Sequence, residues 1–119
     1  MRHAERDSRL ECCGLLAGGD GAITNAFAAT NAAADTAKNY EIAPEQLFQL
    51  MREMRAAGLA LMGIYHSHPN GDNVPSPRDV ERAYYPDVAY FIVSPNAPAR
   101  VRAFSIRDGS VAELKIVAE

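Results

Sequence analysis

The order of patterns along the 119-residue chain predicts an α/β fold. Apolar runs of strand length alternate with segments that repeat apolar residues at helical spacing, and glycine, proline and asparagine separate them. With 48% hydrophobic and 23% charged residues, the composition is that of a globular protein that can bury a core. We therefore expect the whole chain, residues 1–119, to form a single domain.

The clearest helix is expected over Pro44–Ala57, where apolar residues recur at i, i+3, i+4 and i+7. Proline suits the first position of a helix, and Gly58 suits the position after its end. The apolar stripe consists of Leu47, Leu50, Met51 and Met54. Because such a stripe is far more often core packing than a cofactor site, we expect these side chains in the core. Further helices are expected over residues 2–9 and 77–85, the second ended by Pro86.

Strands are expected where short apolar runs are bounded by turn residues. The run Cys12–Ala17 is closed by the glycine-rich hairpin turn Gly18–Gly21. The run Leu59–Tyr65 is apolar throughout and ends directly before two histidines. The remaining expected strands are Ala22–Ala29, Tyr40–Ile42, Val88–Val93, Arg100–Ile106 and Val111–Val117. The expected loops and turns are residues 30–39, residues 70–75 and Asp108-Gly109.

Composition and charge exclude several classes of protein. The chain has 12 basic and 15 acidic residues and a net charge of −3, so it has no basic excess with which to bind nucleic acid. The longest nearly uncharged apolar stretch, Ala56–Tyr65, is about half of the ~20 residues that a membrane helix needs. The N-terminus lacks an apolar signal region, and Cys12 and Cys13 are too few for a disulfide framework. We therefore expect a cytoplasmic protein without nucleic-acid or membrane partners.

The segment His66-Ser67-His68 carries the first candidate site residues. In an extended strand, residues i and i+2 point to the same side, about 6 to 7 Å apart at the backbone, which suits two ligands of one metal ion. Pro69 cannot continue the hydrogen-bonded ladder, so the strand ends where these side chains would enter a cleft. A hydrogen-bonded or exposed histidine pair at a strand end is the alternative interpretation.

The segment Ser76-Pro77-Arg78-Asp79 has the pattern of a helix start. Serine at the N-cap, proline at N1 and a carboxylate at N3 approach a capping box, which is the structural interpretation. The functional interpretation is that Asp79 is held rigidly and supplies a third ligand. Two imidazoles and one carboxylate suit Zn²⁺, and three protein ligands leave one position open for water, as in catalytic zinc sites.

Glu11 stands directly before the first apolar strand. It is either an ordinary solvated carboxylate or the base that a hydrolytic zinc site needs. Only a fold that pairs the first strand with Leu59–Tyr65 can bring it near the histidines. A cysteine nucleophile at Cys12 or Cys13 is a further alternative, although a cysteine in an apolar run is usually an inert core residue.

The combined spacing resembles a known family. The chain reads Glu11, then His66-Ser67-His68, seven residues, Ser76, two residues and Asp79, which is the pattern of the JAMM (MPN+) zinc metalloproteases. The stretch ECCGLLAG is similar to the family's Glu-x-Cys-Gly-Leu-Leu segment, and HSHPNGDNVPSPRD is similar to its prokaryotic metal segment. The resemblance extends from about Arg2 to Ser94.

The resemblance implies a fold and a set of residue roles. The implied fold is a mixed, mostly antiparallel central sheet flanked by helices, the MPN/JAMM fold, which is similar to that of cytidine deaminase. His66, His68 and Asp79 would hold Zn²⁺, Glu11 would be the general base, and Ser76 would line the oxyanion position. Family members usually carry a longer helix before the glutamate, whereas ten residues precede Glu11 here, so we expect a shortened or truncated N-terminal helix.

The resemblance to bare-core prokaryotic members also implies a substrate. The expected function is a zinc-dependent metallopeptidase or isopeptidase that hydrolyses an amide bond at the C-terminal tail of a small ubiquitin-like or sulfur-carrier protein. An extended Gly-Gly tail is expected to add as a strand beside a sheet edge and lie across the metal. The alternatives are a non-catalytic MPN-type protein-binding scaffold and a RadC-like protein associated with DNA repair, against which the acidic charge argues. The oligomeric state is left open.

Overall fold

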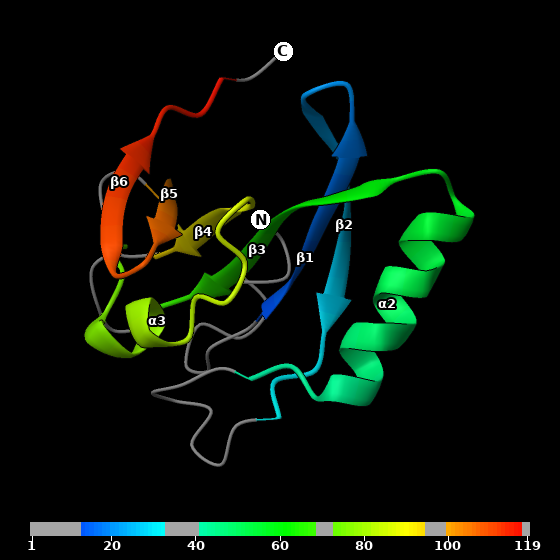
Figure 1. Cartoon of the computed structure of the whole chain (residues 1–119), viewed down its shortest axis with the longest axis horizontal. Coiled ribbons are helices and arrows are strands. Elements are labelled where there is room, and N and C mark those ends of the chain that lie inside the picture. The colour runs from blue at the N-terminus through cyan, green and yellow to red at the C-terminus, as the bar shows by residue number, and fades with distance from the viewer. Residues whose placement is uncertain (1–12, 33–40, 69–72, 95–99, 118–119) are drawn as a thin grey trace.

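The computed structural model describes residues 13–32, 41–68, 73–94 and 100–117 (Figure 1). These residues form one six-stranded sheet in the order β2-β1-β3-β4-β5-β6 and two helices. The strands are β1 Cys13–Gly19, β2 Ala22–Ala29, β3 Ala60–Ser67, β4 Ala89–Val93, β5 Val101–Arg107 and β6 Ser110–Leu114. The helices are α2 Pro44–Ala56 and α3 Pro77–Glu81.

The sheet is mixed and mostly antiparallel, so the expected fold class is confirmed. Four of the five strand pairs, β1–β2, β1–β3, β4–β5 and β5–β6, are antiparallel, and β3–β4 is parallel. A parallel pair needs a crossover connection, because the chain must return to the end at which the first strand began. The crossover between β3 and β4 carries α3, and it therefore brings α3 back beside the sheet after β3 has ended.

The core lies on the sheet face that α2 covers, as Figure 1 shows for the long helix beside β1 and β2. Leu50 and Met54 of α2 are buried, which confirms two members of the predicted apolar stripe, and Leu47 and Met51 pack against the same cluster. The sheet side of the cluster consists of Cys13, Leu15, Ala17, Ala29, Ile64, Tyr90, Ile92, Phe104 and Ile106. Because side chains alternate along a strand, His66 lies on the same face as Ile64.

Both expected tight turns are present. Asp20 and Gly21 join β1 to β2 with φ of 55° and 78°, and Asp108 and Gly109 join β5 to β6 with φ of 50° and 81°. Two consecutive left-handed residues make a hairpin turn whose twist matches that of the flanking strands. Aspartate followed by glycine is the residue pair that adopts this conformation at least cost.

Three expected elements differ from the structure by more than two residues at an end. Helix α3 ends at Glu81 instead of residue 85. Beyond it, Tyr85 precedes Pro86, which disfavours helical backbone there, and the Tyr85 N–H donates to the Tyr90 hydroxyl at 3.0 Å. The strand expected over Tyr40–Ile42 is wrong for Glu41 and Ile42. Glu41 accepts one backbone hydrogen bond from Ala32 at 2.7 Å, but its own N–H donates to the side chain of Asn31, so no ladder forms.

The last expected strand, Val111–Val117, is shorter in the structure, where β6 ends at Leu114. Leu114 pairs with Ala103, so one further pair would place Lys115 opposite Arg102. Like charges directly opposite each other destabilise a sheet, which accounts for the early end of the strand. The expected helix over residues 2–9, Cys12 and most of the 30–39 loop lie outside the described residues. Within the described ranges, neither helix is long and apolar enough to cross a bilayer.

Candidate metal centre

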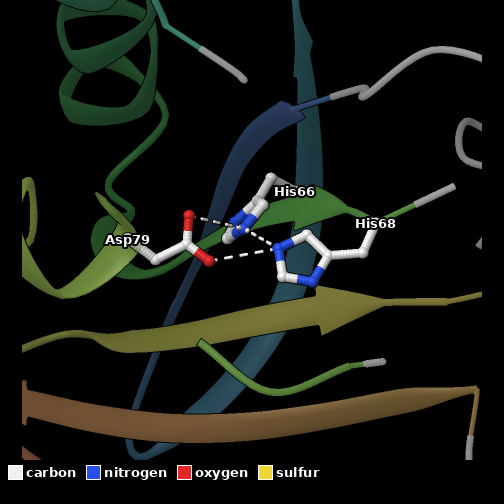
Figure 2. Close-up of side chains that lie close together, drawn as sticks. All are labelled: His66, His68 and Asp79. Carbon is white, nitrogen blue, oxygen red and sulfur yellow. Dashed lines mark hydrogen bonds and ion pairs between the residues drawn. The ribbon is translucent and has the colours of Figure 1, made fainter. Parts of the chain in front are cut away.

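His66 and His68 lie at the end of β3 and point to the same side, as their spacing predicts (Figure 2). Their Nε2 atoms are 3.0 Å apart, and their rings meet edge to face with centroids 4.9 Å apart. His66 is 1% exposed, because it continues the apolar face of the sheet opposite Cys13 and Ile92. The backbone N–H of His68 donates to the carbonyl of Val93 at 2.8 Å, which extends the pairing of β3 with β4 by one residue.

Asp79 reaches the histidines from the first turn of α3. The expected capping box is present: the Asp79 N–H donates to the Ser76 hydroxyl oxygen at 3.1 Å, and the Ser76 N–H donates to Asp79 Oδ2 at 2.8 Å. The same carboxylate places Oδ1 3.2 Å from His66 Nε2 and Oδ2 3.1 Å from His68 Nε2 (Figure 2). The structural and functional interpretations of this segment are therefore compatible, because the cap holds the carboxylate toward the histidines.

The electrostatics of the cluster favour the forms that bind metals. Burial lowers the pKa of His66 below its ordinary value, in opposition to the Asp79 carboxylate, which raises it. Burial alone would raise the pKa of Asp79, but hydrogen bonds from His66, His68 and the Ser76 backbone outweigh it and hold this pKa well below its usual range. A neutral imidazole beside an ionised carboxylate is the state that a divalent cation requires of these ligands.

The three contacts within the cluster cannot all be hydrogen bonds at once. Each Nε2 carries at most one proton. If both nitrogens donate to Asp79, the His66–His68 contact brings two donors together, and if one accepts, its contact with Asp79 brings two lone pairs together. A cation removes this conflict, because all three atoms then direct lone pairs at it.

The dimensions of the cluster also fit a metal ion. His66, His68 and Asp79 offer one ligand atom each, all within 4.8 Å of one another. The three contacts measure 3.0, 3.1 and 3.2 Å. The edge of a tetrahedron with metal–ligand bonds of ~2.05 Å is ~3.3 Å long, close to these values. The donor set therefore fits a tetrahedral metal with one remaining position.

Comparison with known proteins places the chain in a family. The family model for prokaryotic homologs of the JAB domain, Prok-JAB, matches residues 1–107. The chain belongs to the Prok-JAB family. This membership confirms the family resemblance that the Glu, His-x-His and Ser-x-x-Asp spacing indicates.

Two curated relatives and one solved structure are similar to this Prok-JAB chain. The "desampylase" of Haloferax volcanii is 37% identical over 118 residues, which cover 98% of this chain and 84% of that protein. The "CysO-cysteine peptidase" of Mycobacterium tuberculosis is 36% identical over 117 residues, which cover 95% of this chain and 80% of that protein. The solution structure of a Desulfitobacterium hafniense protein has a TM-score of 0.84 and 28% identity and covers 98% and 83% of the two chains.

The structure describes only some of the remaining predicted site residues. Glu11 lies outside the described residues, and its role stays a prediction. Strand β1 does pair with β3, with Cys13 opposite His66, and this is the pairing on which the role of Glu11 depends. Ser76 is the N-cap of α3, and its oxyanion role also stays a prediction. Cys13 is completely buried in the apolar cluster of this Prok-JAB protein, as is typical of a structural cysteine.

Two features of the site were not foreseen from the sequence. Ser94 is completely buried and directly follows Val93, whose carbonyl accepts from the backbone N–H of His68, so it belongs to the same end of the sheet. A single serine gives no sequence signal of burial, since serines are mostly exposed. The second feature bears on the expected edge addition of a substrate tail, which stays a prediction. Strand β3 is flanked by β1 and β4, and the edge strand β2 lies two strand spacings, ~10 Å, from it.

Proposed function

We propose that this protein is a cytoplasmic, zinc-dependent metallopeptidase or isopeptidase that hydrolyses an amide bond at the C-terminal tail of a small ubiquitin-like or sulfur-carrier protein. The observation that carries the proposal is the convergence of His66, His68 and Asp79 on one point. The names of the two relatives, a desampylase and a CysO-cysteine peptidase, support the substrate class.

His66, His68 and Asp79 would hold the zinc ion. When bound, zinc supplies a Lewis acid that polarises the scissile carbonyl and makes water a nucleophile near neutral pH. The chain contributes the orientation of the ligands: β3 fixes both histidines, and the capping box fixes the aspartate. Because His66 is almost fully buried whereas His68 and Asp79 are partly exposed, we assign the solvent-facing side of the site to His68 and Asp79.

During hydrolysis, Glu11 would transfer protons and Ser76 would stabilise the negative charge of the oxyanion. Glu11 takes a proton from the attacking water and passes it to the leaving amine. The Ser76 hydroxyl oxygen already accepts a hydrogen bond from the Asp79 backbone, which leaves the hydroxyl proton to donate toward a developing oxyanion. The serine would therefore cap the helix at rest and bind the oxyanion during turnover.

The substrate tail is expected to approach over the face of the sheet. The end of β3 is interior to the sheet, so a tail cannot extend the ladder of β3. An extended Gly-Gly terminus has no side chains that would keep its backbone away from the buried end of this strand. We therefore expect thin, glycine-ended tails to be cleaved and tails with bulky residues before the scissile bond to be rejected.

The proposal is tested with Asp79→Asn and the matched control Asp87→Asn. Asparagine at position 79 can still accept the hydrogen bond from the Ser76 N–H, so α3 keeps its cap while the metal loses its charged ligand. Asp87 is exposed and pairs with Arg107 at 2.8 Å, away from the histidines. We expect about one equivalent of zinc in the wild type and in Asp87→Asn, and less in Asp79→Asn.

Activity is measured on a small carrier protein with a Gly-Gly terminus joined by an amide bond to cysteine or to a lysine. Cleavage by the wild type and Asp87→Asn, and none by Asp79→Asn, supports the proposal. Zinc binding without cleavage of either conjugate overturns the substrate class. A wild type that binds no zinc at micromolar concentrations overturns the proposal of a zinc-dependent enzyme, and the non-catalytic scaffold then becomes the better interpretation.

A further inference from the structure

Strand β6 is an open edge of the sheet with unusual properties. All five of its residues are exposed, and among residues 13–32, 41–68, 73–94 and 100–117 it pairs with β5 alone (Figure 1). Four large apolar residues in and after it, Val111, Leu114, Ile116 and Val117, are 38% to 72% exposed. Exposed edges are normally protected by proline, bulges or a dense set of charges. Residues 110–117 contain no proline, and the β5–β6 register has no irregularity.

The opposite edge, β2, also lacks proline but differs in two respects, its exposed apolar residues and its register. Its one large exposed apolar side chain is Ile23, and its other exposed residues include Thr24 and Asn25. The register between β1 and β2 shifts between Ala17 and Gly18, which bends that edge. The contrast indicates that β6 is adapted to a partner, whereas β2 is adapted to solvent.

We propose that β6 pairs antiparallel with β6 of a second copy of this chain, about a two-fold axis at Leu114. In this register Leu114 lies opposite Leu114, and Glu113 lies opposite Lys115 of the other copy. The two outer pairs are Ala112 with Ile116 and Val111 with Val117. Every apolar residue of the segment then meets an apolar residue, and both charges meet the opposite charge.

Neighbouring registers lose this match. With the axis at Glu113, two carboxylates lie opposite each other and Val111 meets Lys115. With the axis between Glu113 and Leu114, each glutamate meets a leucine and Ala112 meets Lys115. The sequence of the segment therefore selects one register, as a specific isologous interface requires.

The partner chain also supplies an opposite charge for Lys115. Within one chain, continuing β6 would place Lys115 opposite Arg102, and the strand ends at Leu114. Arg102 already binds Glu113 through two hydrogen bonds, of 2.9 and 2.6 Å. In the pair of chains, Lys115 lies opposite the partner's Glu113. That carboxylate then accepts from this Lys115 and from the Arg102 of its own chain. Residues 115–117, which are outside any strand in the single chain, then extend β6.

The paired sheet would have a functional consequence. A two-fold axis perpendicular to the sheet keeps equivalent faces on the same side, so both His66–His68–Asp79 clusters face the same way. Seven strand spacings separate β3 from its copy, which is ~34 Å before sheet twist. Two sites at this separation can engage two conjugates on one target at the same time, and avidity then strengthens binding.

Charge-reversed variants of the full chain test the proposal. Lys115→Glu places two carboxylate pairs at the interface, and Glu113→Lys places two ammonium pairs there, so each variant alone should dissociate. We expect the wild type to sediment as a dimer and each variant to have a dissociation constant raised about tenfold or more. Mixed in equal amounts, the two variants restore both opposite-charge pairs and should form a heterodimer. Arg55→Glu on the exposed side of α2 makes the same charge change and serves as the control.

Crosslinking tests the register independently of the charges. Leu114→Cys places a thiol opposite its own copy and should form a disulfide-linked dimer under mild oxidation, whereas Val111→Cys faces Val117 and should not. The wild type controls for its own cysteines, and circular dichroism checks that each variant folds. A specific dimer should form at about 100 µM, so a wild type that is still monomeric at this concentration overturns the proposal. Charge-reversed variants that dimerise like the wild type also overturn it. A dimer that crosslinks equally at both positions overturns the register.

Discussion

The end of β3 and the edge strand β6 depart from the usual distribution of polar and apolar residues in opposite directions. At the end of β3, His66 is buried and Asp79 is mostly enclosed, whereas along β6 Val111 and Leu114 are exposed. Burying polar groups and exposing apolar ones both cost free energy unless a partner compensates. Each region therefore lacks a compensating partner within the chain. The end of β3 fits a cation, and β6 fits another copy of the same strand.

Removing the metal should have the largest effect of the changes considered. Chelation is expected to abolish cleavage, and added zinc is expected to restore it. Because a ligand that binds only the folded state stabilises it, the free energy of unfolding should fall by about 3–4 kcal/mol when zinc had been present at 100 to 1,000 times its dissociation constant. Thermal unfolding with and without chelator measures this loss. An unchanged melting temperature would show that the cluster does not bind the metal.

Glu11→Gln should have the next largest effect, on the reaction alone. Glutamine keeps the shape of the side chain but cannot take a proton, and general bases contribute about 10²–10⁴-fold to rate. We expect kcat to fall by this factor while the zinc content stays at the wild-type level. A variant that cleaves as fast as the wild type would remove Glu11 from the mechanism and leave the metal cluster unaffected.

Ser76→Ala should combine a moderate rate effect with a small stability effect. Loss of an oxyanion donor costs about 10²–10³-fold in kcat, and loss of an N-cap costs about 1 kcal/mol of the free energy of unfolding. Ser76→Thr retains the hydroxyl and should restore most of both. If alanine changes only the stability, measured by denaturant unfolding, Ser76 is a cap without a catalytic role.

Leu114→Lys should have the smallest effect on the single chain and a selective effect on pairing. Leu114 is exposed, so the free energy of unfolding of the monomer is expected to change by less than about 0.5 kcal/mol. Hydrolysis of a substrate with one conjugate should be unchanged, whereas the dimer should dissociate because two ammonium groups face each other at the axis. A parallel loss of monomer stability would show that Leu114 packs within its own chain.

Local patterns predicted much of the fold and the chemistry of the site. The stripe of α2, the two aspartate-glycine turns and the capping box at Ser76 depend on contacts within a few residues, so the sequence alone determined them. The alternation of His66 and His68 is of the same kind. The end of β6 depends instead on Arg102 of the neighbouring strand, and the residues after α3 depend on a contact with Tyr90 of β4, so neither follows from a local pattern.

The tertiary structure alone decided which of these local features meet. The spacing of His66, Ser76 and Asp79 was compatible with a solvated histidine pair and a simple helix cap, and it became a cluster because β3 and β4 are parallel and their crossover returns α3 to the sheet. The exposure of β6 likewise depends on strand order, which places it at an edge. Strand order and crossover direction arise from pairings between distant segments. These pairings depend on the whole chain and leave no periodic pattern in the sequence.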